Sequence, residues 1–128
     1  MSYKLINYCE IDEFASQSYS RIHNVDKSLN LGDITKVDTS KIEDFDMLVG
    51  GSPCQDFSSS GKKAGAVWTC KDCGYEYNPL TAHFTKRDEC PHCKSKNIEK
   101  TRSSLIVEYL RILRDKKPKF CVYENVKN

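Results

Sequence analysis

Two Cys-x-x-Cys pairs in the middle of the chain constrain its fold more than any other feature. Cys70 and Cys73 form the first pair, Cys90 and Cys93 form the second, and 16 residues separate the pairs. This spacing lies within the range expected for a tetrahedral four-thiolate zinc site. Four thiolates leave no open coordination position, so we expect a structural zinc ion whose binding folds the segment. Redox-active pairs or fortuitous spacing are the alternatives.

The remaining composition favours a single reduced, cytoplasmic domain. The chain has 128 residues, a net charge of +2 and seven cysteines. It shows no signal segment and no apolar run near the roughly 20 residues that span a bilayer, and the odd number of cysteines argues against a disulfide scaffold. Cys9 and Cys121 are expected to be small apolar residues in buried strands.

Outside the cysteine-rich segment, hydrophobic periodicity predicts alternating strands and helices. Asp12 is the expected N-cap of the first helix, whose apolar face includes Phe14, Tyr19 and Ile22. The order is a strand at 4–9, a helix at 13–23, strands at 29–34 and 45–49, a helix at 103–116 that ends at Lys116-Lys117-Pro118, and a strand at 120–123. In the second helix the residues expected to face a sheet are Leu105, Ile106, Tyr109, Leu110 and Leu113. This is an α/β pattern with a mostly parallel sheet.

A cysteine and an acid follow two of the predicted strands. Cys54 lies on a Gly/Pro turn after strand 45–49, and Glu124 follows strand 120–123. The second helix should carry the second strand back beside the first, so both groups should reach one edge of the sheet. A thiolate and a carboxyl there could act on one substrate as nucleophile and proton donor or hydrogen-bond anchor. A surface acid and an inert thiol are the alternatives.

Basic and aromatic side chains are interleaved in and beside the cysteine-rich segment. Such a mixture suits contact with a nucleic-acid backbone and base stacking, and it equally suits a solvated face that keeps a small module soluble. The basic residues are Lys71, His83, Lys86, Arg87, Lys94, Lys96, Lys100 and Arg102.

Five motifs in order resemble the DNA (cytosine-5)-methyltransferases. Gly51–Gln55 resembles the catalytic loop of that family and Glu124–Asn128 resembles its second catalytic motif. The other similar segments are Thr101–Leu105, Cys9–Asp12 and Gly32–Ile34. The resemblance implies a partial Rossmann-like S-adenosylmethionine-dependent methyltransferase sheet at 1–66 and 101–128, with a zinc ribbon inserted at 67–100.

The resemblance also implies a reaction on cytosine flipped out of duplex DNA. Cys54 would attack C6 of the base and Glu124 would hydrogen-bond N3, so that C5 accepts a methyl group from S-adenosylmethionine. Glu10 would hold the cofactor ribose and Asp33 the adenine amine. The residues that would line the cofactor pocket are Ile11, Ile34, Pro53 and Leu105. A restriction–modification role in a bacterial or phage-like setting is expected.

Two motifs of the family have no counterpart in the sequence. No glycine-rich motif precedes Tyr3, and no target-recognition segment follows Asn128. We expect the isolated chain to be inactive and to require a complementing methyltransferase fragment or self-association. The alternative is a non-catalytic zinc-containing module that binds DNA or a protein; for it, Cys54→Ala would change nothing and Cys70→Ala would abolish binding.

Overall fold

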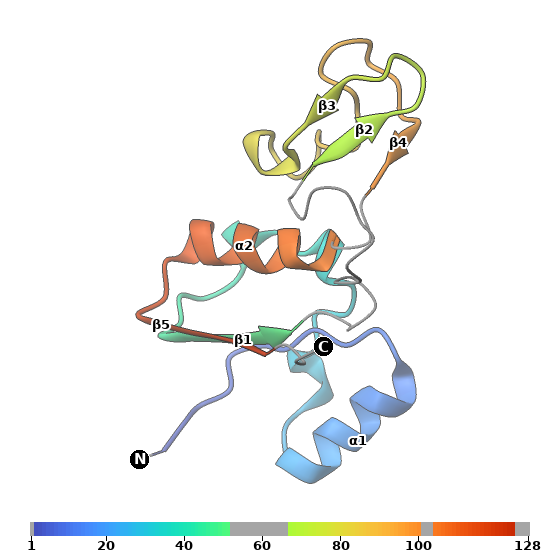
Figure 1. Cartoon of the computed structure of the whole chain (residues 1–128). Helices are drawn as coiled ribbons and strands as arrows, with labels where there is room; N and C mark the ends of the chain where they lie inside the picture. The colour runs from blue at the N-terminus through green and yellow to red at the C-terminus, as the bar shows by residue number, and fades with distance from the viewer. Residues whose placement is uncertain (1, 52–66, 101–103, 125–128) are drawn as a thin grey trace.

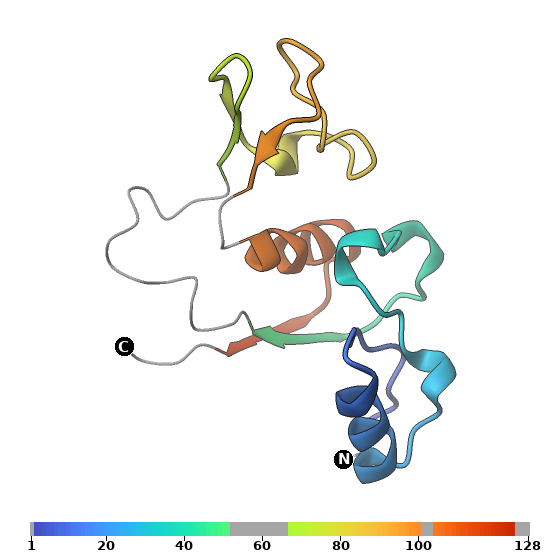
Figure 2. The same cartoon turned by 90° about the vertical axis from the view of Figure 1, so that its right-hand side faces the viewer.

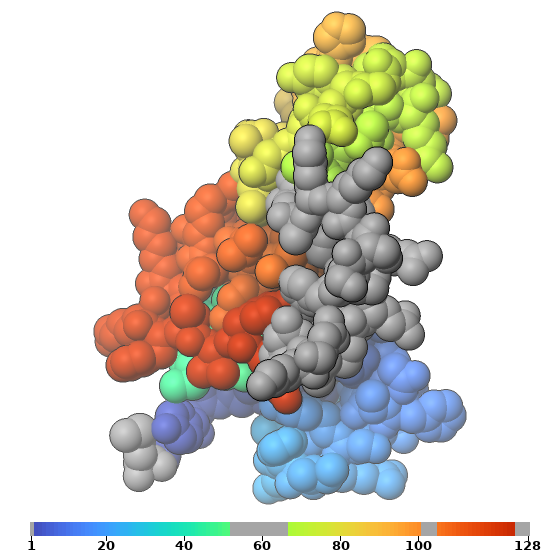
Figure 3. Space-filling view, in the orientation of Figure 1, coloured from blue at the N-terminus to red at the C-terminus, as the bar shows by residue number. Residues whose placement is uncertain are grey.

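A computed structural model describes residues 2–51, 67–100 and 104–124, and it stacks the elements in layers. Helix α2 (Ser104–Lys116) lies between the cysteine-rich segment and a parallel pair of strands, β1 (Met47–Gly51) and β5 (Phe120–Glu124). Helix α1 (Glu13–His23) lies beyond this pair and to one side of it (Figures 1 and 2). The space-filling view shows the cysteine-rich segment projecting from one end of the molecule (Figure 3). The described chain is thus a mixed α/β structure with a small parallel sheet, and no described helix is long and apolar enough to cross a membrane.

Helix α1 begins where the sequence predicts. Asp12 is its N-cap, and the Asp12 carboxylate accepts a hydrogen bond from the backbone N–H of Ala15 at 2.7 Å. The buried side differs from the prediction, because Phe14 and Ile22 are exposed while Ser16 is buried. Tyr19 packs between Tyr8 and His23, with ring centroids 4.6 and 4.4 Å away. The helix is therefore fixed by this aromatic cluster and by the hydrogen bonds of Ser16 to Tyr8 and Asn30, while Phe14 and Ile22 remain in solvent.

The predicted parallel pairing of the two later strands is confirmed. Strands β1 and β5 run parallel, with Met47 opposite Phe120 and Gly51 opposite Glu124. The first strand extends through Gly51, two residues beyond the predicted end, because Gly51 still pairs with its neighbour. The expected burial of Cys121 is wrong: this residue is exposed, since β5 has a strand neighbour on one edge only among the described residues.

Helix α2 covers one face of this pair and ends as predicted. Lys117 adopts a left-handed conformation at φ 48°, and its N–H donates to the carbonyl of Leu113. Tyr109 faces the sheet, with its ring 5.1 Å from that of Tyr123 and its hydroxyl donating to the Val122 carbonyl. Leu110, expected on the same face, is 37% exposed. The residues of α2 that are buried with Tyr109 are Val107, Glu108, Arg111 and Ile112.

The two strands predicted at 4–9 and 29–34 shrink to a single parallel bridge between Tyr8 and Asn30. The physical reason is the Asn30 side chain, which accepts from the Glu10 N–H at 3.0 Å and donates to the Glu10 carbonyl at 2.8 Å. These backbone groups would otherwise extend a ladder. Short 3₁₀ turns flank the bridge and continue beyond it: η1 (Lys27–Leu29), η2 (Ile34–Lys36) and η3 (Thr39–Lys41).

The cysteine-rich segment forms its own antiparallel sheet. Strand β2 (Trp68–Cys70) lies between β3 (Glu76–Tyr77) and β4 (Ile98–Glu99), and a short turn, η5 (Pro79–Thr81), follows β3. Trp68 and Tyr77 are buried, and their rings pack edge to face with centroids 6.3 Å apart. This core is too small to stabilise a fold of its own.

Candidate functional site

The carboxyl ends of β1 and β5 bring Glu124 beside the Gly50-Gly51 pair. Glu124 is exposed and lies opposite Gly51 in the register. A Cβ atom on Gly51 would meet the Glu124 carbonyl oxygen at 2.7 Å, and one on Gly50 would meet the Tyr109 ring at 2.9 Å. Both glycines are therefore required by close approach, one to the neighbouring strand and one to α2.

Pro53 and Cys54 lie outside the described residues. Gly51, the last described residue before them, ends β1 at the edge where Glu124 ends β5. This edge is where sequence reasoning expects the two predicted catalytic groups to meet.

The two acids predicted to bind a cofactor lie on segments joined by the Tyr8–Asn30 bridge. Both follow the bridge in its parallel direction, Glu10 by two residues and Asp33 by three. The Glu10 side chain accepts from the Asp12 N–H at 2.8 Å. The Asp33 carboxylate accepts from the hydroxyl and the N–H of Thr35, at 2.7 and 2.9 Å, and these bonds lower the pKa of Asp33. Two carboxylates are thus presented at one end of this pair of segments.

The predicted apolar lining is dispersed over three elements. Ile11 follows Glu10 and is 78% exposed, while Ile34 begins η2 and is half-buried. Leu105 is half-buried in the first turn of α2. Of the three described lining residues, Ile11 and Ile34 directly follow the two acids, Glu10 and Asp33, in the sequence.

The four cysteines of the two pairs converge as the sequence predicts. Their sulfur atoms all lie within 4.8 Å of one another. The Sγ atoms of Cys70 and Cys93 are 3.5 Å apart, and those of Cys73 and Cys90 are 3.6 Å apart. Zn–S bonds of about 2.3 Å in a tetrahedron separate sulfurs by about 3.8 Å. The cluster thus has the dimensions of a four-thiolate metal site.

The two Cys-x-x-Cys pairs lie on two separate backbone turns of the same kind. The N–H of Gly74 donates to the Cys70 carbonyl at 2.8 Å, and the N–H of Lys94 donates to the Cys90 carbonyl at 3.0 Å. Gly74 and Lys94 both have left-handed backbone conformations, with φ of 74° and 64°. Glycine is expected at this position, whereas lysine is not, so the second turn could not be recognised from residue type. The two turns present two sulfurs each to a common centre.

The thiols of this cluster differ strongly in acidity. Burial opposes ionisation of Cys90, but the N–H groups of Cys93 and His92, together with the thiols of Cys73 and Cys93, outweigh it and lower the pKa of Cys90 to about 7. The N–H of Tyr75 favours the Cys73 thiolate, yet burial and the neighbouring thiols raise the pKa of Cys73 to about 12. Four crowded sulfurs therefore cannot all ionise at neutral pH without a cation, which suits a divalent metal.

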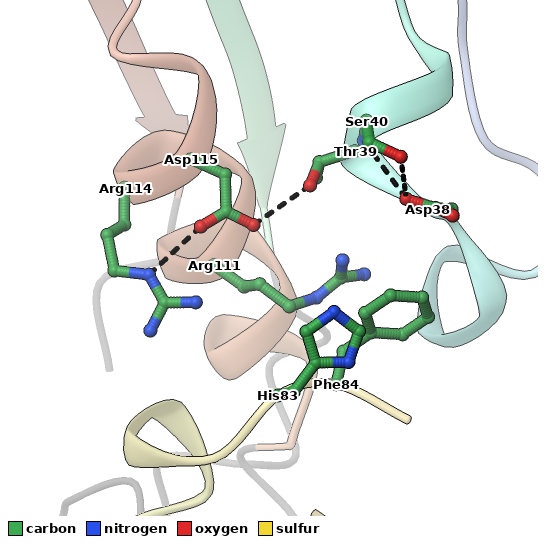
Figure 4. A pocket seen from close by; sticks show the side chains of 8 residues that line it. All are labelled: Asp38, Thr39, Ser40, His83, Phe84, Arg111, Arg114 and Asp115. Carbon is green, nitrogen blue, oxygen red and sulfur yellow. Dashed lines mark hydrogen bonds and ion pairs between the residues drawn. The ribbon is translucent and has the colours of Figure 1, made fainter. Parts of the chain in front are cut away.

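The contact between the cysteine-rich segment and α2 was not predicted from the sequence. Arg87, predicted to be part of a basic surface, is buried and bonded to Glu108 of α2 at 2.6 Å. The i, i+3 spacing of Glu108 and Arg111 within an apolar helix was the available signal. Beside this contact is a cavity of about 220 Å³ (Figure 4) lined by Asp38, Thr39, Ser40, His83, Phe84, Arg111, Arg114 and Asp115.

The cavity lies where several elements meet, and none of the predicted catalytic or cofactor-binding residues lines it. Its acids are occupied within it: Asp115 accepts from the Thr39 hydroxyl at 2.9 Å and from Arg114 Nε at 3.0 Å. These bonds lower the pKa of Asp115 against the opposing effect of burial. The junction joins η3, α2 and the loop at His83.

Comparison with known proteins identifies the family. A model of the C-5 cytosine-specific DNA methylases matches residues 1–79 and 92–128, which leaves only part of the cysteine-rich segment unmatched. The chain is 39% identical over 128 residues to the orphan methyltransferase M.SPBetaI of Bacillus phage SPbeta, covering 99% of this chain and 29% of that protein.

The same values hold for the putative type II methyltransferase M.BsuMIIP of Bacillus subtilis. The type II methyltransferase M1.ScrFI of Lactococcus lactis is 35% identical over 93% of this chain and 22% of its own length. The chain thus spans less than a third of these relatives. It belongs to the C-5 cytosine-specific DNA methylase family.

Proposed function

We propose that the chain supplies the catalytic thiol and acid of a DNA (cytosine-5)-methyltransferase. The observation that carries the proposal is the pairing of Gly51 with Glu124. Cys54 follows Gly51 by three residues, so chain connectivity keeps the Cα atoms of Gly51 and Cys54 within about 11 Å of each other. Neighbouring strands lie about 4.8 Å apart, and a nucleobase is small enough to touch a thiol and a carboxyl separated by such distances.

The proposed chemistry assigns each residue one role. The Cys54 thiolate adds to C6 of a cytosine taken out of the duplex, and Glu124 holds N3, so electron density builds at C5. S-adenosylmethionine, when bound, supplies the methyl group. Loss of the C5 proton then expels the thiolate and restores the aromatic ring.

Glu10 and Asp33 are the proposed cofactor acids. A carboxylate at the end of a strand accepts two hydrogen bonds from a ribose diol, and a second carboxylate accepts from an exocyclic amine. Their position beyond the Tyr8–Asn30 bridge supports this assignment. Ile11, Ile34, Pro53 and Leu105 are the proposed apolar lining.

We further propose that residues 67–100 form a zinc ribbon inserted between the two methyltransferase segments, 1–66 and 101–128. The dimensions of the sulfur cluster and the two matching turns support zinc, which would be held by Cys70, Cys73, Cys90 and Cys93. A closed set of four thiolates favours a structural role.

The proposed partner, besides DNA, is a polypeptide that carries the remaining parts of the methyltransferase. Parallel sheets are normally covered on both faces, yet the face of β1 and β5 opposite α2 is apolar and open. Val49 is 65% exposed and Phe120 is 62% exposed, and Met47 and Val122 lie on the same face. Within the described ranges, β1 does not pair with the segment around Tyr8. A Rossmann-like sheet would result if a strand filled this gap.

Methylation by the chain combined with such a polypeptide tests the proposal. Transfer of labelled methyl groups to DNA should be abolished by Cys54→Ala and strongly reduced by Glu124→Gln. Cys121→Ala, which removes an exposed thiol from the strand that carries Glu124, should leave the rate unchanged. Full activity of Cys54→Ala would refute the assignment, and robust methylation by the isolated 128-residue chain would refute the need for a partner.

A further inference from the structure

Three charged side chains are buried together where the cysteine-rich segment meets α2. Arg87, Glu108 and Arg111 are 3%, 1% and 2% exposed. One Glu108 oxygen lies 2.6 Å from Arg87 Nη2, and the other lies 2.9 Å from Arg111 Nη2 and accepts from Arg111 Nε at 3.0 Å. One carboxylate therefore joins two cations that are 24 positions apart in the sequence and belong to different modules.

Both arginines also donate hydrogen bonds to backbone carbonyls of the turn that follows Asp33. Arg111 donates to the carbonyls of Ile34 and Val37 at 3.0 and 2.8 Å, and Arg87 donates to the carbonyl of Thr35 at 3.3 Å. A single 3₁₀ turn offers few internal partners for these carbonyls. The two guanidinium groups thus bond to carbonyls of this turn, while Asp33, its N-cap, accepts from the N–H and the hydroxyl of Thr35.

The backbone at Arg87 is itself fixed by the cysteine-rich segment. The hydroxyl of buried Tyr77 donates to the Arg87 carbonyl at 2.6 Å, and Cys90 begins the second turn three residues later. The position of the Arg87 guanidinium therefore depends on the fold that the four cysteines organise.

The charges of the cysteine-rich segment are nearly balanced. Residues 67–100 contain six lysines and arginines against five aspartates and glutamates. Arg87 is buried, and Lys100 is paired with Asp88 at 2.6 Å. The net charge of residues 67–100 therefore provides little general attraction to a phosphate backbone.

We propose that Arg87 is a positioning residue through which the metal-folded segment holds the turn 33–37 and, with it, the Asp33 carboxylate. The proposal rests on the proposed cofactor role of Asp33 for its consequence in catalysis, but the mechanical link is independent of that role. Arginine suits this position because its terminal Nη2, at the end of a side chain longer than that of lysine, contacts both Glu108 and the Thr35 carbonyl, and its planar guanidinium lies over the Trp68 ring at 5.6 Å.

Amide hydrogen exchange on the zinc-loaded chain tests the link. The Lys36 and Val37 amides, which donate to the carbonyls of Asp33 and Ile34, report on the turn, and the Phe120 amide, which donates to the Asp46 carbonyl, reports on the sheet. Arg87→Met should accelerate exchange in the turn by about tenfold or more relative to the sheet, because charge-assisted bonds are lost. Arg87→Lys should not restore it, and Lys86→Met, an exposed neighbour, is the matched control.

Unchanged exchange in the turn, or equal acceleration in turn and sheet, would overturn the positioning role. A second assay uses the complemented methyltransferase and separates this role from the proposed function. Arg87→Lys should raise the KM for S-adenosylmethionine with little change in kcat. If Asp33→Asn weakens cofactor binding and Arg87→Lys does not, the function stands and the positioning role fails. If Asp33→Asn has no effect, the cofactor assignment fails while the exchange result still decides the mechanical link.

Discussion

Neutralising Glu108 should destabilise the chain far more than neutralising an exposed acid. Glu108→Gln keeps the size of the side chain but removes the charge that compensates Arg87 and Arg111, both almost completely buried. The amide oxygen can still accept from one guanidinium group, but the amide NH₂ then faces the other, so the contacts of 2.6, 2.9 and 3.0 Å lose the negative charge and one guanidinium loses its acceptor. Leaving buried charges without a partner costs about 3–5 kcal/mol, which in a domain of this size lowers the melting temperature by about 10 to 20 °C.

Urea unfolding of the zinc-loaded chain measures this loss. Glu13→Gln is the matched control, because the ion pair between Glu13 and Lys27 is exposed and should contribute nothing measurable. In a double-mutant cycle, Arg87→Met should cost at least about 1 kcal/mol less in the Glu108→Gln background than in the native one, because Arg87 is then already uncompensated. A midpoint change no larger than that of the control, or a coupling energy near zero, would refute the reasoning.

Three further predictions concern the metal, the sheet edge and the open face. Metal affinity should fall as the pH is lowered, by about tenfold per pH unit for each proton that the metal displaces. The reason is that the Cys73 thiol, whose pKa is raised to about 12, must lose its proton to bind the metal. A zinc affinity that does not change between pH 6 and 8 would contradict this. Gly51→Ala should cost about 1–3 kcal/mol in chemical unfolding and reduce methylation in the complemented enzyme, because its Cβ would meet the Glu124 backbone at 2.7 Å; native stability would count against the close approach. Phe120→Lys should leave the unfolding midpoint of the isolated chain unchanged, since this side chain is largely exposed, yet weaken co-purification with the complementing polypeptide; undiminished association would argue against docking on this face.

Signals contained in short stretches of sequence predicted several elements correctly. Asp12 and the apolar spacing after it located α1, and the strand–helix–strand order, with a short connection from α2 to β5, predicted the parallel pairing of β1 with β5. The Cys-x-x-Cys spacing predicted the convergence of the four sulfurs because metal geometry allows few arrangements.

Three of the errors share a physical cause, which is a polar side chain that makes a tertiary contact where the sequence predicted a backbone contact, an apolar contact or solvent. Asn30 takes the backbone bonds of Glu10 that would have extended two strands. Glu108 and Arg111 occupy the buried side of α2 where periodicity favoured Leu110. Arg87 was predicted to lie on the surface because its partner, Glu108, is distant in the sequence. Such pairings depend on tertiary contacts that no short window of sequence contains.

The identity of the residue that becomes bonded to cytosine tests the central claim most directly. DNA with 5-fluorocytosine at the target should trap the adduct in the complemented enzyme, because fluorine at C5 cannot leave as a proton does. Digestion and mass spectrometry should then find the modified base on the peptide that contains Cys54, and only when S-adenosylmethionine is supplied. An adduct on another cysteine, or methyl transfer with no adduct at Cys54, would contradict the account.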